Sequence, residues 1–176
     1  MRNFRIMASR STKAMPPSCT LNAFARMGLV QSIAAVFTRF ARPSSDSTDH
    51  PGHVLGRRGE RIAERHLRRA RYKILHRNFR AKGGGEADLV CRDRATDDLV
   101  FVEVKTRSTR DFGDPAHAVD STKQHLLARA AFAWLRLLDH PEIHFRFDIV
   151  EVVIAGDATS VNIIRNAFEL PRPYLY

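Results

Sequence analysis

GEADLV, at residues 85–90, and LVFVEVK, at residues 99–105, decide the fold of this chain. Both stretches are rich in apolar and β-branched residues, which is typical of strands buried in a sheet. Because side chains alternate across a strand, Glu103 and Lys105 share a face with Phe101, while the valines of the second stretch point the other way. Burying an unpaired carboxylate is costly, so the acids of both strands need either a neighbouring cation or exposure to solvent.

Two acids and a lysine on neighbouring strands predict a divalent-metal site for phosphodiester cleavage. Mg²⁺ and Mn²⁺ prefer carboxylate and carbonyl oxygens and keep several bound waters. We predict Asp88 and Glu103 as metal ligands, with the carbonyl of Val104 as a third. Lys105 would orient the attacking water or stabilise charge on the phosphate. Glu60 is a further catalytic candidate, because it stands at the head of the apolar stripe of the preceding predicted helix, where an apolar residue would be expected.

Each charge taken alone also has an ordinary explanation. Glu103 and Lys105 would form an ion pair of little energetic value if their sheet face were solvated. The remaining acids would then belong to a turn and to a helix start, where the helix dipole favours them. The joint placement of four charges against the apolar pattern favours the metal site. Glu86, on the same strand face as Asp88, is the second choice of acid, and Asp93 is predicted to be a turn residue.

The charge balance of the chain favours a polyanionic partner. Its 176 residues carry 29 Lys and Arg against 19 Asp and Glu, a net charge of +10. Eleven of the basic residues lie between Gly56 and Lys82, directly before the acidic strands, which points to nucleic acid, although a solvated basic helix has the same composition. The predicted phosphate contacts are Arg57, Arg58, Arg61, Arg77, Arg80, Lys82, Arg107 and Arg110.

The hydrophobic pattern predicts an α-β-β-β-α-β-β order over residues 56–170. The predicted helices are 59–70 and 121–138, and the predicted strands are 72–79, 86–92, 99–106, 145–154 and 160–165. Short turns join the first three strands, which predicts an antiparallel meander. The fold class is therefore α/β, a mixed sheet flanked by helices.

Residues 1–55 differ from this domain in composition. They hold seven Lys and Arg and two Asp, and Pro- and Ser-rich segments flank a stretch at 21–40 with helical spacing. We expect a basic extension that is disordered or loosely helical, and a short tail at 171–176. A transit peptide or an over-long start would have the same composition. The chain has no run of eighteen apolar residues and no cysteine or histidine spacing typical of zinc, so neither a membrane span nor a zinc site is predicted.

Several blocks of the sequence resemble the YraN-like family of bacterial proteins. The blocks are GxxGE from Gly56, NFR from Asn78, GEADLV from Gly85, VFVEVKTR from Val100, RFD from Arg146 and NAF from Asn166. The likeness covers roughly residues 56–168. It implies a restriction-endonuclease-like fold of the PD-(D/E)xK superfamily, close to archaeal Holliday-junction resolvases.

The resemblance also implies roles for individual residues. Asp88 matches the motif aspartate, Glu103 the (D/E) position, Lys105 the motif lysine and Glu60 the helix glutamate of resolvase-like members. Gln124 resembles a polar residue that often lies beside the site, and we add it to the predicted nucleic-acid contacts. The proline that commonly precedes the motif aspartate is replaced here by an alanine, which removes no ligand.

The predicted function is a Mg²⁺- or Mn²⁺-dependent endonuclease, acting on DNA that is branched or damaged. An RNA-processing nuclease would carry the same residues. The alternative is a non-catalytic nucleic-acid-binding protein that kept the nuclease fold, since a fold alone does not establish a reaction. By analogy with resolvases, which cut two strands, a homodimer is expected. We expect a cytoplasmic location and no membrane partner.

Overall fold

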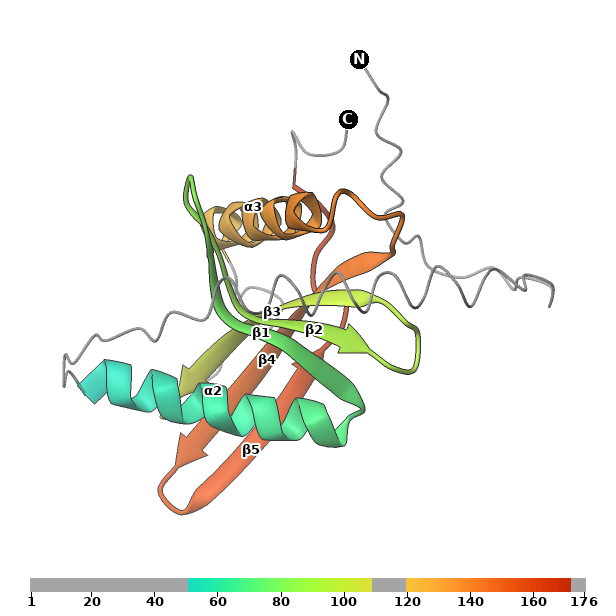
Figure 1. The fold of residues 1–176 in the computed structure, drawn as a ribbon. Coiled ribbons are helices and arrows are strands. Elements are labelled where there is room, and N and C mark those ends of the chain that lie inside the picture. The colour runs from blue at the N-terminus through green and yellow to red at the C-terminus, as the bar shows by residue number, and fades with distance from the viewer. Residues whose placement is uncertain (1–50, 109–119, 172–176) are drawn as a thin grey trace.

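A five-stranded mixed sheet lies between two helices (Figure 1). The computed structural model describes residues 51–108 and 120–171. The elements are α2 (Pro51–Arg69), β1 (Tyr72–Ala81), β2 (Gly85–Asp93), β3 (Leu99–Arg107), α3 (Ser121–Leu137), β4 (Phe145–Ala155) and β5 (Ala158–Ile164). This order confirms the α/β class and the predicted sequence of elements. The helix predicted at residues 21–40 lies outside the described residues.

The sheet has the strand order β1-β2-β3-β4-β5. β1, β2 and β3 pair antiparallel, which confirms the predicted meander. β3 and β4 pair in parallel, and β4 and β5 pair antiparallel. A parallel pair needs a long connection between its strands, and α3 lies in that connection.

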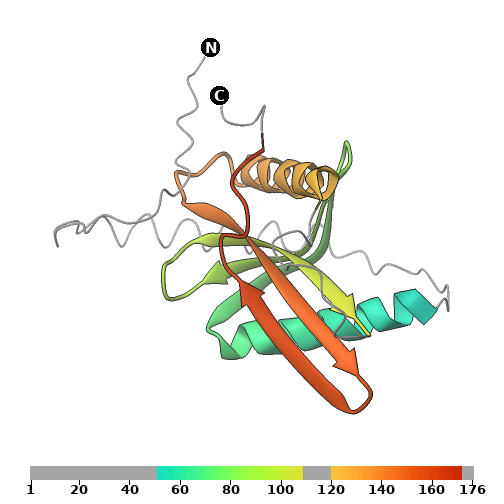
Figure 2. The same ribbon diagram turned by 180° about the vertical axis from the view of Figure 1, so that it is seen from behind.

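Alternation along the strands produces two cores, one on each face of the sheet. Figures 1 and 2 show α2 and α3 on opposite sides of it. On the α3 face, Trp134 and Leu127 pack against Phe101. On the α2 face, Leu67 packs against Val100 and its neighbours on the sheet. The even and odd positions of β3 therefore serve different cores, as period-two alternation requires.

The start of the first helix differs from the prediction. We expected it at Gly59, but α2 begins at Pro51, eight residues earlier. Pro51, Gly52 and Gly56 look like helix-breaking residues in the sequence. Proline is nevertheless tolerated in the first turn, where its missing N–H has no partner to lose, and glycine costs a helix only about 1 kcal/mol.

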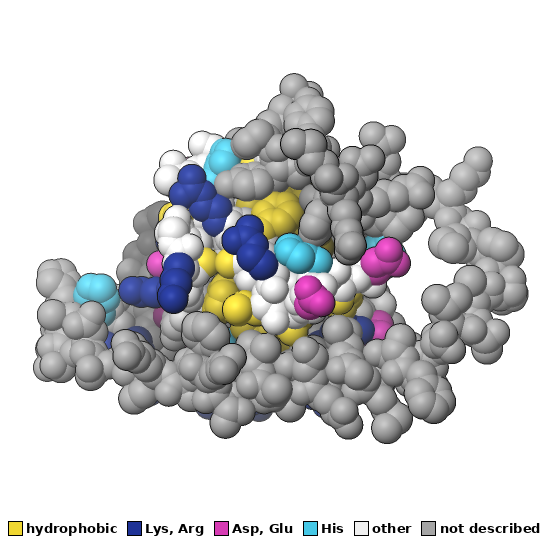
Figure 3. Space-filling view, turned by 45° about the horizontal axis from the view of Figure 1, so that its top comes forward, with side chains coloured by type: hydrophobic (Ala, Val, Ile, Leu, Met, Phe, Trp, Pro, Cys, Tyr) yellow, Lys and Arg dark blue, Asp and Glu magenta, His cyan; other side chains and the backbone are white. Residues whose placement is uncertain are grey.

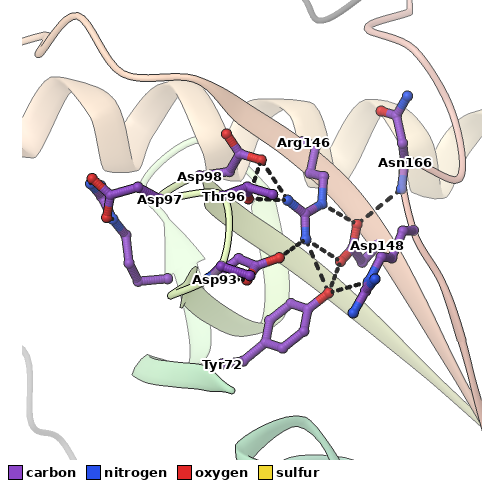
Figure 4. Close-up of polar contacts among 11 residues, drawn as sticks. Tyr72, Asp93, Thr96, Asp97, Asp98, Arg146, Asp148 and Asn166 are labelled. Carbon is purple, nitrogen blue, oxygen red and sulfur yellow. Dashed lines mark hydrogen bonds and ion pairs between the residues drawn. The ribbon is translucent and has the colours of Figure 1, made fainter. Parts of the chain in front are cut away.

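A buried ion cluster links β4 to the first residue of β1 and the last residue of β2 (Figure 4). The guanidinium group of Arg146 reaches Asp93 at 2.7 Å, Asp98 at 2.6 Å and Asp148 at 3.0 Å. The hydroxyl of Tyr72 donates to Asp148 and accepts from Arg146, both at 3.0 Å. Asp93 does precede a turn, as predicted, but its second role as a buried partner of Arg146 was missed.

Candidate metal and nucleic-acid site

Strands β2 and β3 separate at Asp88. Their paired register ends at Leu89↔Val102, although both strands continue beyond that pair. The Asp88 carboxylate lies in the gap, where its Oδ2 accepts the backbone N–H of Val104 at 2.7 Å. In a strand, the N–H and C=O of one residue point to the same side, so the carbonyl of Val104 faces this gap as well. Two of the predicted metal-binding groups therefore share one opening in the sheet.

Glu103 and Lys105 lie on the same face of β3, as the alternation predicted. Lys105 Nζ donates to Glu103 Oε1 at 2.9 Å. The ion pair between Glu103 and Lys105 is thus present. It does not lie on a solvated sheet face, however, because Glu103 is only 5% exposed. A carboxylate this deeply buried is held in one place, which is what a ligand or an orienting group requires.

The electrostatics of the site favour a cation. Burial and the charge of Glu103 raise the pKa of Asp88 to about 7, and the charges of Glu60 and Glu86 act in the same direction. The N–H of Val104 opposes this shift. These four acids, Glu60, Glu86, Asp88 and Glu103, form what we call the acidic cluster. A divalent ion would relieve their mutual repulsion, so the donor chemistry fits Mg²⁺ or Mn²⁺.

Glu60 reaches the cluster from α2. Its Oε2 accepts a hydrogen bond from Asn78 Nδ2 at 3.4 Å. Asn78 lies across from Asp88 in the β1–β2 register and has a left-handed backbone with φ 49°. Asparagine adopts this region more readily than most residues. The kink turns a polar side chain of β1 toward the helix glutamate, and Glu60 therefore points toward the sheet.

Two glycines bring the helices close enough to the sheet to build the cluster. A Cβ on Gly59 would overlap the side chain of Thr106, and one on Gly85 would lie 2.5 Å from the backbone nitrogen of Ala130. Each glycine directly precedes an acid of the cluster in the sequence. The close approach of α2 to β3, and of α3 to β2, therefore depends on the missing side chains.

Lys123, on α3, is a site residue that the sequence analysis missed. Its Nζ lies 3.2 Å from Glu86 Oε1 and 3.8 Å from Glu103 Oε1. Burial lowers the pKa of Lys123, but the nearby charges of Glu103 and Glu86 outweigh burial and raise it overall. Gln124, predicted from the family resemblance, is the next residue. The missed signal was a lysine in the first turn of a helix, where the helix dipole disfavours a cation and a compensating acid is expected.

The predicted phosphate-binding residues fall into two groups. Arg57, Arg58 and Arg61 are exposed on α2, and Lys82 is exposed in the turn between β1 and β2. These side chains are available to a large polyanion. Figure 3 shows the side of the molecule that carries α3, where Lys and Arg side chains gather toward one end of the described surface and Asp and Glu toward the other.

The other predicted contacts have acidic neighbours within the protein. Arg77 Nε donates to Glu64 at 2.9 Å, and Arg80 and Arg107 lie 3.9 and 4.0 Å from Glu86 and Glu151, respectively. The side chains of Arg80 and Arg107 are nevertheless partly or largely exposed, so their phosphate contacts stay predictions. Arg110 lies outside the described residues.

Within residues 51–108 and 120–171, no group of three His, Cys, Asp or Glu side chains is arranged to hold a metal ion. The predicted site consists of two carboxylates and a backbone carbonyl. No helix in the same part of the chain has the length and apolar character needed to cross a membrane.

Comparison with known proteins shows one consistent likeness. The sequence model of the family described as "Uncharacterised protein family UPF0102" matches residues 59–152. A UPF0102 protein of Geobacter sulfurreducens is 46% identical over 122 residues, which cover 69% of this chain and 93% of the relative. UPF0102 proteins of Geobacter metallireducens and Caldicellulosiruptor saccharolyticus are 46% and 41% identical over 116 residues each, covering 66% and 65% of this chain and 93% and 96% of those relatives. The matched region contains the acidic cluster and the sheet from β1 into β4.

Proposed function

This chain belongs to the uncharacterised protein family UPF0102, and we propose that it is a metal-dependent endonuclease that hydrolyses phosphodiester bonds in nucleic acid, with DNA as the first candidate. The observation that supports this most is the gap between β2 and β3. There the carboxylate of Asp88 lies beside the Val104 backbone, and Glu103 and Lys105 follow on the same strand. Membership of the PD-(D/E)xK superfamily is part of the same proposal, supported by the order of elements and by the motif positions.

The residues of the gap suit the chemistry of a hydrolase. Asp88, Glu103 and the carbonyl of Val104 would hold Mg²⁺ or Mn²⁺, which supplies Lewis acidity and water of lowered pKa when bound. An ammonium group has three donors, and Glu103 takes one donor of Lys105. The remaining donors are available to the attacking water or to a phosphate oxygen. Because Glu103 is buried, it fixes the direction in which Lys105 presents them.

The surroundings of the gap suit a phosphate backbone. The first turn of α3 reaches the acidic cluster through Lys123, whereas α2 reaches it through Glu60, near the middle of that helix. The N-terminus of α3 favours an anion at this point. Arg57 and Arg61 are exposed on α2 close to Glu60 in the sequence. Contacts of this kind position the nucleic-acid backbone independently of the base sequence. We therefore propose that the protein selects its substrate by the shape of the nucleic acid.

A metal-titrated cleavage assay tests the proposal. Linear, nicked and four-way DNA and a structured RNA are incubated with Mg²⁺ or Mn²⁺, and Asp88→Ala and Lys105→Ala serve as site variants. We expect cutting that requires the metal and that both substitutions abolish. Cutting that is indifferent to both would contradict the assignment. Sedimentation of the protein with and without four-way DNA tests the proposed homodimer, and fractionation of cells tests the proposed cytoplasmic location.

A non-catalytic nucleic-acid-binding protein is the second candidate. The observation that favours it is the presence of two lysines, Lys105 and Lys123, within 4 Å of Glu103, which partly neutralise the cluster without any metal. Such a protein would bind the same DNA panel without cutting it. Its affinity would be insensitive to divalent ions and unchanged in Lys105→Ala.

A further inference from the structure

Glu103 has two lysine neighbours, although one is enough for the proposed chemistry. Lys105 Nζ is 2.9 Å from Glu103 Oε1, and Lys123 Nζ is 3.8 Å from the same oxygen. Lys123 also lies 3.2 Å from Glu86. One lysine of α3 thus bridges acids of β2 and β3 across the side of the site that faces α3.

The backbone around Lys123 holds it in this position. Asp120 caps α3, and its carboxylate accepts the backbone N–H of Lys123 at 2.8 Å. The close contact between Gly85 and the backbone of Ala130 fixes α3 against β2 about two helical turns further along the same face. Since a cation in the first turn is disfavoured by the helix dipole, the acids beside Lys123 offset this cost. The placement of Lys123 therefore depends on the acidic cluster.

We propose that Lys123 is the counter-ion of the acidic cluster in the metal-free protein, and that a divalent ion must displace it to bind Glu103. This inference rests on the proposed metal site. A lysine ammonium is a compact charge on a flexible stem. The Lys123 side chain is 36% exposed, so it has a path to solvent when it leaves Glu103. Lys123 then acts through Glu103 and Glu86 as a positioning residue, and it lowers the affinity of the site for metal.

The consequence is a coupling between metal and substrate. Without nucleic acid, the positive charges of Lys105 and Lys123 repel a divalent ion. A phosphate brought to the gap adds negative charge and offers the displaced ammonium group a new partner. Metal and nucleic acid therefore bind better together than separately, and each raises the affinity for the other by the same factor.

Calorimetric titration with Mn²⁺, in the absence of nucleic acid, tests the inference on the full chain. Lys123→Met removes the charge and should tighten Mn²⁺ binding about ten-fold, from Coulomb repulsion between a single and a double charge roughly 6 Å apart in a water-like medium. Lys123→Arg keeps the charge and should bind Mn²⁺ like the wild type. Arg136→Met, at the exposed far end of α3, lowers the net charge equally and should stay within about two-fold of the wild type, because solvent and salt screen distant charges.

Unchanged or weaker Mn²⁺ binding by Lys123→Met would overturn the inference, because a merely structural lysine gives that result. Lys123→Gln repeats the measurement should the Met variant fail to fold, with circular dichroism as the check. Binding of Mn²⁺ by neither the wild type nor the Lys123 variants would instead refute the metal site of the proposed function. Equal binding by the wild type and Asp88→Asn would refute the assignment of Asp88 as a ligand, whatever the Lys123 variants do.

Discussion

Replacing Asp88 by asparagine should make the metal-free protein more stable at alkaline pH. Burial and the neighbouring acids raise the pKa of Asp88 from 3.8 to about 7. Between these values the folded protein still binds a proton that the unfolded chain has lost. The native state then binds more protons than the unfolded state, so the free energy of unfolding falls as pH rises through this window. Asparagine carries no charge and is free of this loss.

The size of the effect follows from the same shift. The interval from 3.8 to about 7 corresponds to about 4 kcal/mol at about 1.36 kcal/mol per pH unit. The pKa of about 7 already includes the hydrogen bond from the Val104 N–H, which favours the charged carboxylate, and asparagine still accepts that bond. We therefore expect Asp88→Asn to be more stable than the wild type by up to about 4 kcal/mol at pH 8. Near pH 4 the variant should have no advantage, because the wild-type carboxyl is then protonated.

Urea denaturation in EDTA, at pH 4 to 8, measures this difference. Asp157→Asn, in the exposed turn between β4 and β5, is the matched control and should show no such pH-dependent gain. A stability difference between Asp88→Asn and the wild type that is the same at both ends of the pH range would refute the argument. So would a variant that is less stable at pH 8 than the wild type.

Three further predictions concern the scaffold and its charge. Arg146→Met should lower the free energy of unfolding by about 3–5 kcal/mol in urea denaturation, because it leaves buried carboxylates without their cation; a loss under about 1 kcal/mol would contradict this. Gly59→Ala should destabilise the protein by about 1–3 kcal/mol, because the new Cβ would overlap Thr106. Gly56→Ala has open space around its Cβ and should stabilise the protein by about 1 kcal/mol. Equal changes in melting temperature for the two variants would refute the close approach of α2 to β3. Arg61→Gln should reduce the slope of log affinity against log salt for duplex DNA by about 1, and an unchanged slope would remove this arginine from the phosphate contacts.

Much of the fold was predictable from local patterns. The alternation in LVFVEVK placed Glu103 and Lys105 together because strand geometry depends on neighbouring residues alone. The short turns predicted the antiparallel meander for a similar reason. The start of α2 was not predictable in this way. Its first turn contains a proline and a glycine, whose effect on a helix depends on position and packing more than on residue type.

The candidate site was predictable in its parts but incomplete as a whole. Asp88, Glu103 and Glu60 stood out because each is an acid in an apolar pattern. Lys123 did not, because its one local signal, a cation in the first turn of a helix, does not identify the acids that it meets when the helix packs on the sheet. The pairing of Arg77 with Glu64, and of Arg146 with Asp93, likewise depends on contacts between distant segments. Such contacts leave no local signal in a single sequence.

The most direct test of the central claim compares DNA cleavage by the wild type and by Asp88→Asn at pH 8 in increasing Mg²⁺. This variant is expected to be folded and more stable than the wild type, so loss of activity cannot be attributed to unfolding. We predict metal-dependent cutting by the wild type and none by Asp88→Asn at any Mg²⁺ concentration. Cutting by the variant at the wild-type rate would contradict a nuclease site at the gap between β2 and β3.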